Sequence, residues 1–103
     1  MIRVNVMYPR DAGGKFDWAY YLGTHVPLLE QRLGAALRGI AVDRGVGAPE
    51  PGGVPAFVAM VHMQFDSVEA FQAAFGPHAQ EIQGDVANYT DILPTVQISE
   101  VAR

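Results

Sequence analysis

Hydrophobic and polar positions alternate at the two ends of the chain. In residues 1–8 the even positions form an apolar face, and residues 92–101 repeat this period of two. The most apolar stretch, 56–65, and a weaker, glycine-containing pattern at 37–46 lie between these ends. Alternation of this kind is typical of β-strands. We therefore predict four strands over these ranges, the second of them with a bend or bulge.

A helical period separates the first two predicted strands. Asp17 is suited to be the N-cap of a helix over residues 18–33, and Gly34 ends it. Pro27 lies inside this helix, removes one N–H and frees the carbonyl of Gly23, so we expect a kink or break there. Steps of 100° per residue point Tyr20 outward. They place one stripe inward, made of Trp18, Leu22, His25, Leu29 and Leu33.

A second helical region follows the third predicted strand. Ser67 is a suitable N-cap for a short helix whose apolar residues are three or four positions apart and which ends at Gly76. Pro77 then opens a further turn through about Gln83. Three stretches rich in glycine, proline, aspartate or asparagine have the composition of loops. They are residues 9–15, 47–55 and 84–91.

The predicted element order is β-α-β-β-α-β over a single domain, residues 1–103. This order is typical of an α+β, ferredoxin-like fold with one antiparallel sheet and both helices on one face. The other face would carry Met7, Val58, Met60, His62 and Gln64. A face of this composition is too apolar to be left exposed to water. We therefore expect a homodimer in which two copies pair through their sheets about a two-fold axis and close a shared barrel.

The composition supports a covered face and excludes several classes of protein. Of the 103 residues, 50% are hydrophobic and only 17% are charged, against about 25% charged in a typical soluble domain. The absence of cysteine excludes disulfides, thiolate metal sites and a cysteine nucleophile. A net charge of −4 argues against nucleic-acid binding, and no apolar run reaches the ~20 residues that span a membrane. We expect a cytoplasmic protein.

The three histidines are the candidates for acid–base chemistry. No histidine pair has metal-ligand spacing and no phosphate-binding glycine motif follows a strand, so we expect neither a metal nor an organic cofactor. His25 is either a core histidine bonded to the carbonyl that Pro27 frees, or a general base in an apolar pocket. His78 is either an exposed turn residue or an acid or base at the pocket rim. His62 fits a structural role in the dimer interface.

A ligand pocket between helices and sheet is the alternative to an ordinary core for the aromatic residues. Large apolar side chains and one polar segment, 88–91, converge on this region in the predicted topology. The segment is either a plain turn or a pocket rim. The candidate ligand-binding residues are Trp18, Tyr21, Met60 or Met63, Phe71, Phe75, Asn88 and Tyr89.

Four motifs together resemble the EthD family and cover nearly the whole chain. They are Tyr8-Pro9, the segment Phe16-Asp17…Tyr20-Tyr21-Leu22…Thr24-His25…Pro27-Leu28, the run Phe65-Asp66-Ser67-Val68-Glu69-Ala70-Phe71, and Asn88-Tyr89-Thr90-Asp91. The resemblance implies a dimeric α/β barrel. It also implies an association with the degradation of ethyl tert-butyl ether, where a protein of this family accompanies a cytochrome P450 system.

These observations lead to one functional hypothesis and two rivals. The protein would bind a small hydrophobic or oxygenated organic ligand in a catabolic pathway, with His25 as central acid or base of an isomerase, dehydratase or monooxygenase type. His78 is a second candidate catalytic residue. The first rival is a non-catalytic accessory or ligand-binding module for the P450 system. The second is haem chemistry, which the resemblance implies through haem-degrading members of the same barrel class. Asn5 and His78 lie in elements comparable to the residues those proteins use, whereas Trp18 lies on the first helix and does not match.

Overall fold

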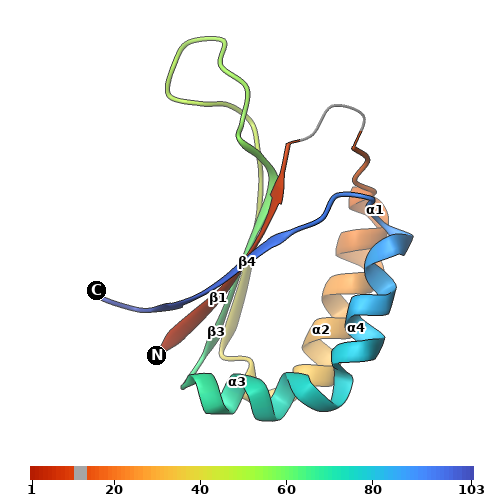
Figure 1. Cartoon of the computed structure of the whole chain (residues 1–103), viewed down its shortest axis with the longest axis vertical. Helices are drawn as coiled ribbons and strands as arrows, with labels where there is room; N and C mark the ends of the chain where they lie inside the picture. Colours follow the sequence, from red (N-terminus) through yellow and green to blue (C-terminus); the bar gives the residue numbers. More distant parts are fainter. Residues whose placement is uncertain (11–13) are drawn as a thin grey trace.

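The fold is an antiparallel sheet with every helix on one face (Figure 1). A computed structural model describes residues 1–10 and 14–103. Residues 11–13 of the loop predicted at 9–15 therefore lie outside the described residues, and the first strand runs on to Pro9. The strands are β1 (Ile2–Pro9), β2 (Gly39–Arg44), β3 (Phe57–Phe65) and β4 (Thr95–Glu100), in the spatial order β2-β3-β1-β4. The predicted ferredoxin-like α+β arrangement is confirmed.

The strand register fixes which side chains face the helices. On the central strand β1, Val4 lies opposite Met63 and Ile98, and Val6 lies opposite Val61 and Val96. These residues face the helices, whereas Asn5 and its partners lie on the helix-free face. The register confirms the predicted faces of residues 1–8 and 56–65, and β3 alternates half-buried and buried residues from Val58 to Phe65.

Two helical arms cover one side of the sheet. The first comprises α1 (Trp18–Tyr20), the π-helical turn η1 (Tyr21–His25), α2 (Val26–Leu33) and a short 3-10 turn, η2 (Gly34–Ala36). The second comprises α3 (Val68–Phe75), η3 (Gly76–His78), α4 (Ala79–Asp85) and η4 (Val86–Asn88). Both predicted N-caps are confirmed, because the side chain of Asp17 accepts from the amide of Tyr20 and that of Ser67 from the amide of Ala70.

The π turn changes which residues of the first arm are buried. The amide of Val26 donates to the carbonyl of Tyr21, five residues back instead of four. Residues before this wide turn are therefore rotated relative to the uniform 100° steps used for the prediction. Leu22, predicted inward, is 53% exposed, whereas Tyr21 is 1% exposed. The break expected at Pro27 is this wide turn, which ends just before it, so that Pro27 falls in the first turn of α2, where a missing amide is tolerated.

The second arm is longer than the sequence pattern indicated. Residues 84–91 were expected to form a loop, but α4 continues to Asp85 and η4 carries the helical path to Asn88. Val86 packs against the core and compensates for Gly84, a poor helix former that lies on the exposed side. The consequence is that Asp85 and Asn88 lie one turn apart on a single helical face.

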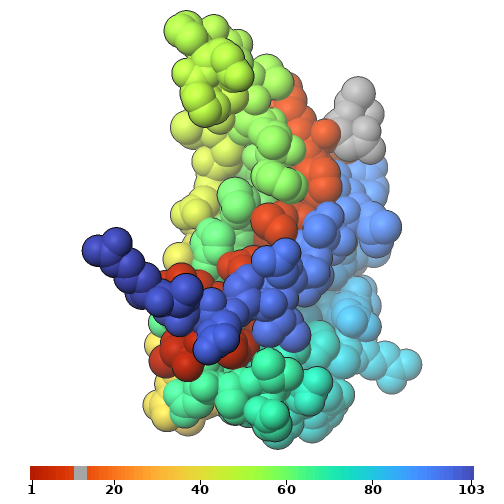
Figure 2. Space-filling view, turned by 60° about the vertical axis from the view of Figure 1, so that its left-hand side comes forward, coloured from red at the N-terminus to blue at the C-terminus, as the bar shows by residue number. Residues whose placement is uncertain are grey.

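The helix-free face of the sheet combines methionines with a polar chain that crosses all four strands. Figure 2, in which this side turns toward the viewer, shows β1 in red between the green of β3 and the blue of β4. His62 Nδ1 lies 2.8 Å from Asn5 Oδ1, and its Nε2 lies 3.1 Å from Asp43 Oδ2. Asn5 in turn donates to Ser99 Oγ at 3.3 Å. None of the helices in the described parts of the chain is long and apolar enough to cross a membrane.

Candidate functional site

An apolar cavity of about 340 Å³ lies between the sheet and the two helical arms. Its innermost side chains are buried, whereas Gln83 and Val96 are exposed and mark its mouth beside β4. A volume of this size is at the lower end of small-molecule sites. The lining residues are Val4, Val6, Tyr8, Tyr21, His25, Leu29, Val61, Met63, Phe71, Phe75, Ile82, Gln83, Val86, Tyr89, Pro94 and Val96.

His25, at the end of the π turn, is paired with a carboxylate behind the cavity wall. Its Nδ1 lies 2.8 Å from Oδ2 of Asp85, and the two side chains are 4% and 14% exposed. Within residues 1–10 and 14–103, His25 Nε2 has no hydrogen-bond partner, yet no side-chain nitrogen or oxygen there is both buried and unpartnered. Nε2 therefore keeps accessible area. Because His25 lines the cavity, this atom is the one available to a ligand there.

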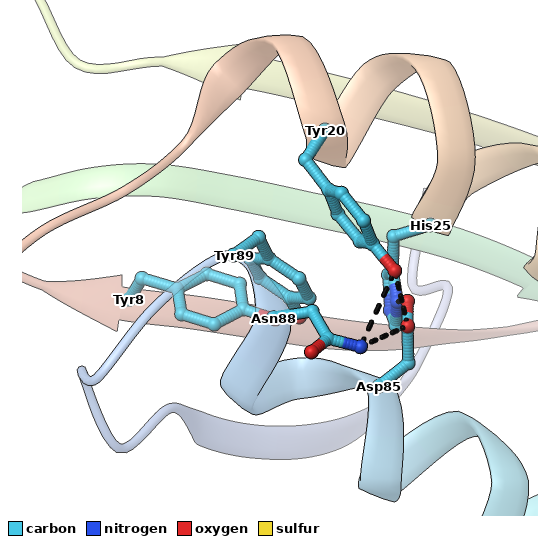
Figure 3. A network of polar contacts seen from close by, with 6 residues as sticks. All are labelled: Tyr8, Tyr20, His25, Asp85, Asn88 and Tyr89. Carbon is cyan, nitrogen blue, oxygen red and sulfur yellow. Dashed lines mark hydrogen bonds and ion pairs between the residues drawn. The ribbon is translucent and has the colours of Figure 1, made fainter.

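Asp85 is held by three donors from both helical arms (Figure 3). Its Oδ1 accepts from the Tyr20 hydroxyl at 2.6 Å and from Asn88 Nδ2 at 2.9 Å, while Oδ2 faces His25. Burial works to raise the pKa of Asp85, but the hydrogen bonds from Tyr20, His25 and Asn88 outweigh it, so this pKa lies below its usual 3.8. The resulting anion requires His25 to carry its proton on Nδ1, which leaves Nε2 as the basic nitrogen of the neutral ring.

Tyrosine rings surround His25 on the cavity side. Tyr21 stacks on the imidazole with ring centroids 5.4 Å apart, and Tyr89 lies 4.6 Å from it. The hydroxyls of Tyr8 and Tyr89 are 2.6 Å apart. Burial raises the pKa of Tyr8, Tyr21 and Tyr89 above the usual 10.0, so all three are neutral hydroxyls near neutral pH.

The loop before β4 fixes the position of Tyr89. The Tyr89 carbonyl accepts from the amide of Asp17 at 2.8 Å, and Phe16 forms an isolated β-bridge with Thr90. These contacts tie the start of the first arm to the end of the second. The two arms are therefore joined at the end of the cavity that holds the polar groups.

The structure brings five of the nine predicted site residues together around the cavity. These are Tyr21, His25, Phe71, Phe75 and Tyr89. Their roles in binding or catalysis stay predictions. The partner of His25 is the Asp85 carboxylate rather than the backbone carbonyl that one interpretation of the sequence required.

The other four predicted residues lie elsewhere. Met60 is on the helix-free face, and strand alternation places Met63 in the cavity instead. Trp18 packs against Phe16 and beneath the guanidinium of Arg44, which lies 5.1 Å from its ring. His78 is half-buried in η3 and does not line the cavity, and Asn88 acts on Asp85 rather than on the cavity.

Three residues of the site were not identified from the sequence. Tyr8 could have been found, because strand alternation turns it inward at the end of β1. The loop composition of residues 84–91 predicts no shared face for Asp85 and Asn88. Regular helical steps point Tyr20 outward, and the π turn brings its hydroxyl to Asp85. No cluster of three or more histidine, cysteine, aspartate or glutamate residues in the described ranges could hold a metal ion.

The fold and site define a class of protein: a ferredoxin-like α+β domain with a closed-in apolar cavity beside a histidine–carboxylate pair. The sequence profile of the EthD domain matches residues 15–92, and the chain belongs to the EthD family. The predicted resemblance is confirmed.

Solved structures agree with this assignment. The chain is 50% identical to an EthD-like protein of Ralstonia eutropha JMP134, with a TM-score of 0.94, covering 99% of this chain and 92% of that one. It is 26% identical to an ethyl tert-butyl ether degradation family protein of Bacillus halodurans C-125, with a TM-score of 0.67 and 98% of both chains covered.

A more distantly related solved structure shares the fold. A Bordetella bronchiseptica protein named as a candidate antibiotic biosynthesis monooxygenase is 15% identical, with a TM-score of 0.61, covering 99% of this chain and 96% of that one. At this identity the likeness concerns the fold alone. A search of curated proteins finds no match.

Proposed function

We propose that this protein binds a small organic molecule in the cavity and that His25, oriented by Asp85, transfers a proton to or from it. The observation that carries this proposal is the division of the imidazole between two environments. Nδ1 is held by a charged carboxylate, and Nε2 keeps accessible area on a side chain that lines a cavity of about 340 Å³. A positioned base of this kind contributes about 10²–10⁴-fold to a rate.

The negative charge of Asp85 supports the action of His25 as a base. When His25 takes a proton on Nε2, the ring becomes a cation that stays 2.8 Å from the negative Asp85. This pairing stabilises the charged intermediate state in the same way as the carboxylate of a catalytic triad. All groups required are side chains of this chain, and the proposed chemistry uses no metal or organic cofactor.

Deuterium exchange into an enolisable ketone tests the proposal without knowledge of the natural substrate. With 2-tetralone in D₂O, Nε2 would remove an α-proton, the C–H electrons would form the enolate C=C bond, and the carbonyl oxygen would carry the charge until a deuteron returns. The wild-type protein should accelerate exchange above buffer, as followed by NMR. His25→Gln should lose about 10²–10⁴-fold of that acceleration.

The other histidines provide matched controls. His78→Gln removes an imidazole that does not line the cavity, and His62→Gln removes one on the helix-free face, so both should keep wild-type exchange. Equal loss in His25→Gln and His78→Gln would contradict the assignment of the base. Binding of the ketone without accelerated exchange would instead support the accessory, ligand-holding role.

Family membership supports the biological setting of this proposal. A relative with this fold is named for ethyl tert-butyl ether degradation. A place in the cytoplasmic breakdown of ethers or other foreign compounds, alongside a cytochrome P450 system, is the setting proposed here.

A homodimer through the helix-free face is also part of the proposal. This face carries Met7 and Met60 beside the polar chain through His62 and Asn5. An apolar sheet face of this kind requires cover, and a second copy about a two-fold axis supplies an identical surface.

A further inference from the structure

The described residues that line the cavity offer hydrogen-bond donors but include no aspartate, glutamate, lysine or arginine. Among its lining residues the polar groups are three tyrosine hydroxyls, His25 and the exposed amide of Gln83. Transfer of an ion into such a space would remove its hydration without supplying an opposite charge. An anion would additionally meet the Asp85 carboxylate behind His25. The cavity is therefore suited to neutral molecules.

The direction of the hydrogen bond between Tyr8 and Tyr89 can be derived from burial. Tyr89 is 0% exposed and Tyr8 is 3% exposed, and their hydroxyl oxygens are 2.6 Å apart. If Tyr8 donated, the Tyr89 proton would be sealed in the protein without an acceptor, which costs about 1–3 kcal/mol. Burial therefore favours donation from Tyr89 to Tyr8, and because Tyr8 keeps accessible area and lines the cavity, its proton is then the one left for a ligand.

This arrangement makes a directed chain from Tyr89 through Tyr8 to the cavity. A hydroxyl that accepts one hydrogen bond is polarised and becomes a better donor in the next. Burial keeps the pKa of both phenols above 10.0, so the chain stays protonated near neutral pH. The Tyr89 ring lies beside both Tyr8, at 6.1 Å, and His25, at 4.6 Å, so the donor and the basic nitrogen share one end of the cavity.

We propose that Tyr8 is the ligand-recognition donor of this cavity, that Tyr89 positions and polarises it, and that the ligand class is neutral carbonyl compounds of one or two rings. The Tyr8 hydroxyl would donate to the carbonyl oxygen while the apolar wall holds the ring system. The proposal rests on the proposed function in one respect, since the same carbonyl would acidify the α-proton that His25 removes.

A pair of probes with the same carbon skeleton isolates the oxygen contact. 2-Tetralone carries the carbonyl and tetralin lacks it, and affinity for each is measured by ligand-observed NMR. Tyr8→Phe should weaken the binding of 2-tetralone about tenfold, as expected for the loss of one hydrogen bond, and leave the affinity for tetralin unchanged. The carboxylate 1,2,3,4-tetrahydro-2-naphthoate should not bind at millimolar concentration.

Two further variants separate recognition from structure. Tyr8→Phe leaves the Tyr89 hydroxyl without its partner, so the double variant Tyr8→Phe/Tyr89→Phe, which removes both hydroxyls, is the better-folded control. It should bind 2-tetralone as weakly as Tyr8→Phe and bind tetralin normally. Tyr89→Phe alone should weaken the binding of 2-tetralone by less than Tyr8→Phe does. The Tyr8 hydroxyl is still present in this variant and has lost only the partner that polarises it.

The outcomes decide this proposal independently of His25. A selective loss of 2-tetralone affinity in Tyr8→Phe supports it, even if no deuterium exchange is seen. Equal weakening of both probes, unchanged 2-tetralone affinity, preferential binding of the carboxylate, or binding of neither probe by the wild-type protein would overturn it. His25-dependent exchange that Tyr8→Phe does not slow would overturn the oxygen site while the proposed function stands.

Discussion

At the scale of single residues, the site depends on a carboxylate that accepts three side-chain hydrogen bonds at once. Asp85 accepts from Tyr20, His25 and Asn88, and these residues come from both helical arms. The anion therefore serves two purposes, since it sets the tautomer of His25 and joins the arms. A substitution at Asp85 should affect both chemistry and stability.

The lowered pKa of Asp85 predicts a stability contribution at moderately acidic pH. A carboxyl whose folded pKa lies below the usual 3.8 stabilises the fold above that value, and this contribution is lost as pH falls through the folded pKa. Asp85→Asn should reduce the free energy of unfolding near pH 6 and flatten its decline below pH 3.8. Urea unfolding at a series of pH values measures this. Parallel curves for the two proteins would contradict the prediction.

The four tyrosine hydroxyls should ionise at higher pH in the folded protein than in the unfolded chain. All four have pKa values raised above 10.0, Tyr20 chiefly through its hydrogen bond to Asp85 and the other three chiefly through burial. The folded protein should show little tyrosinate absorbance at pH 10.0, whereas the protein in denaturant should be about half ionised there. The fold should lose stability as pH rises above 10.0, because only the unfolded chain releases these protons freely.

How far the sequence predicts individual site residues depends on the period that was assumed. Apolar spacing predicts His25, Phe71 and Phe75 on inward faces, whereas the π turn is what buries Tyr21 in place of Leu22. Asp85 and Tyr20 were not identified, since each needs a helical feature that short-range patterns do not encode: the continuation of α4 and the π turn. The sequence leaves Met60 and Met63 as alternatives for the cavity, and the strand register places Met63 on the cavity side.

At the scale of elements, the π turn is the feature that assembles the polar groups. It gives a buried row at intervals of four residues, formed by Tyr21, His25, Leu29 and Leu33. A regular helix of the same sequence would bury Leu22 instead. Wide turns of this kind occur frequently at functional sites, and here the wide turn carries the proposed base at its end.

Substitution of two glycines in the first arm by alanine should change the stability of the fold in opposite directions. Gly23 lies in the π turn with open space around a new Cβ, so Gly23→Ala should stabilise the fold by about 0.4–1 kcal/mol. Gly34 ends α2 with φ of 58° and ψ of −139°, a region used almost only by glycine that costs an L-residue about 1–3 kcal/mol, so Gly34→Ala should destabilise. Thermal unfolding of both variants provides the comparison, and the same sign for both would contradict it.

At the scale of the whole molecule, the two faces of the sheet have separate tasks. The helix-facing side builds the cavity, and the opposite side holds the methionines and the polar chain through His62. The element order and the single-sided placement of the helices were predictable, because strand and helix periods differ clearly. The outward projection of the segment between β2 and β3 was not, since its glycines and prolines indicate only a loop (Figures 1 and 2).

The proposed homodimer predicts a specific effect of charge on the helix-free face. The wild-type protein should sediment as a dimer at micromolar concentration, and Met60→Glu should shift it toward monomer, because a buried unpaired carboxylate is costly. Leu22→Glu, on the exposed side of the first arm, is the matched control and should stay dimeric. A wild-type protein that sediments as a monomer would contradict the assembly.

The π turn also means that the first arm absorbs one extra residue without moving the site. The bond from Val26 to the carbonyl of Tyr21 spans one residue more than an α-helix allows. Deleting the exposed Leu22 would shorten this bond to the regular α-helical spacing and leave Tyr20 and Tyr21 on the faces that they occupy. Forcing the full sequence into a regular helix would instead rotate everything before the turn by about 100°, so that Tyr20 would turn away from Asp85 and Tyr21 would leave the ring of His25. A single-residue gap in an alignment at this position would therefore be compatible with the same site on a regular helix.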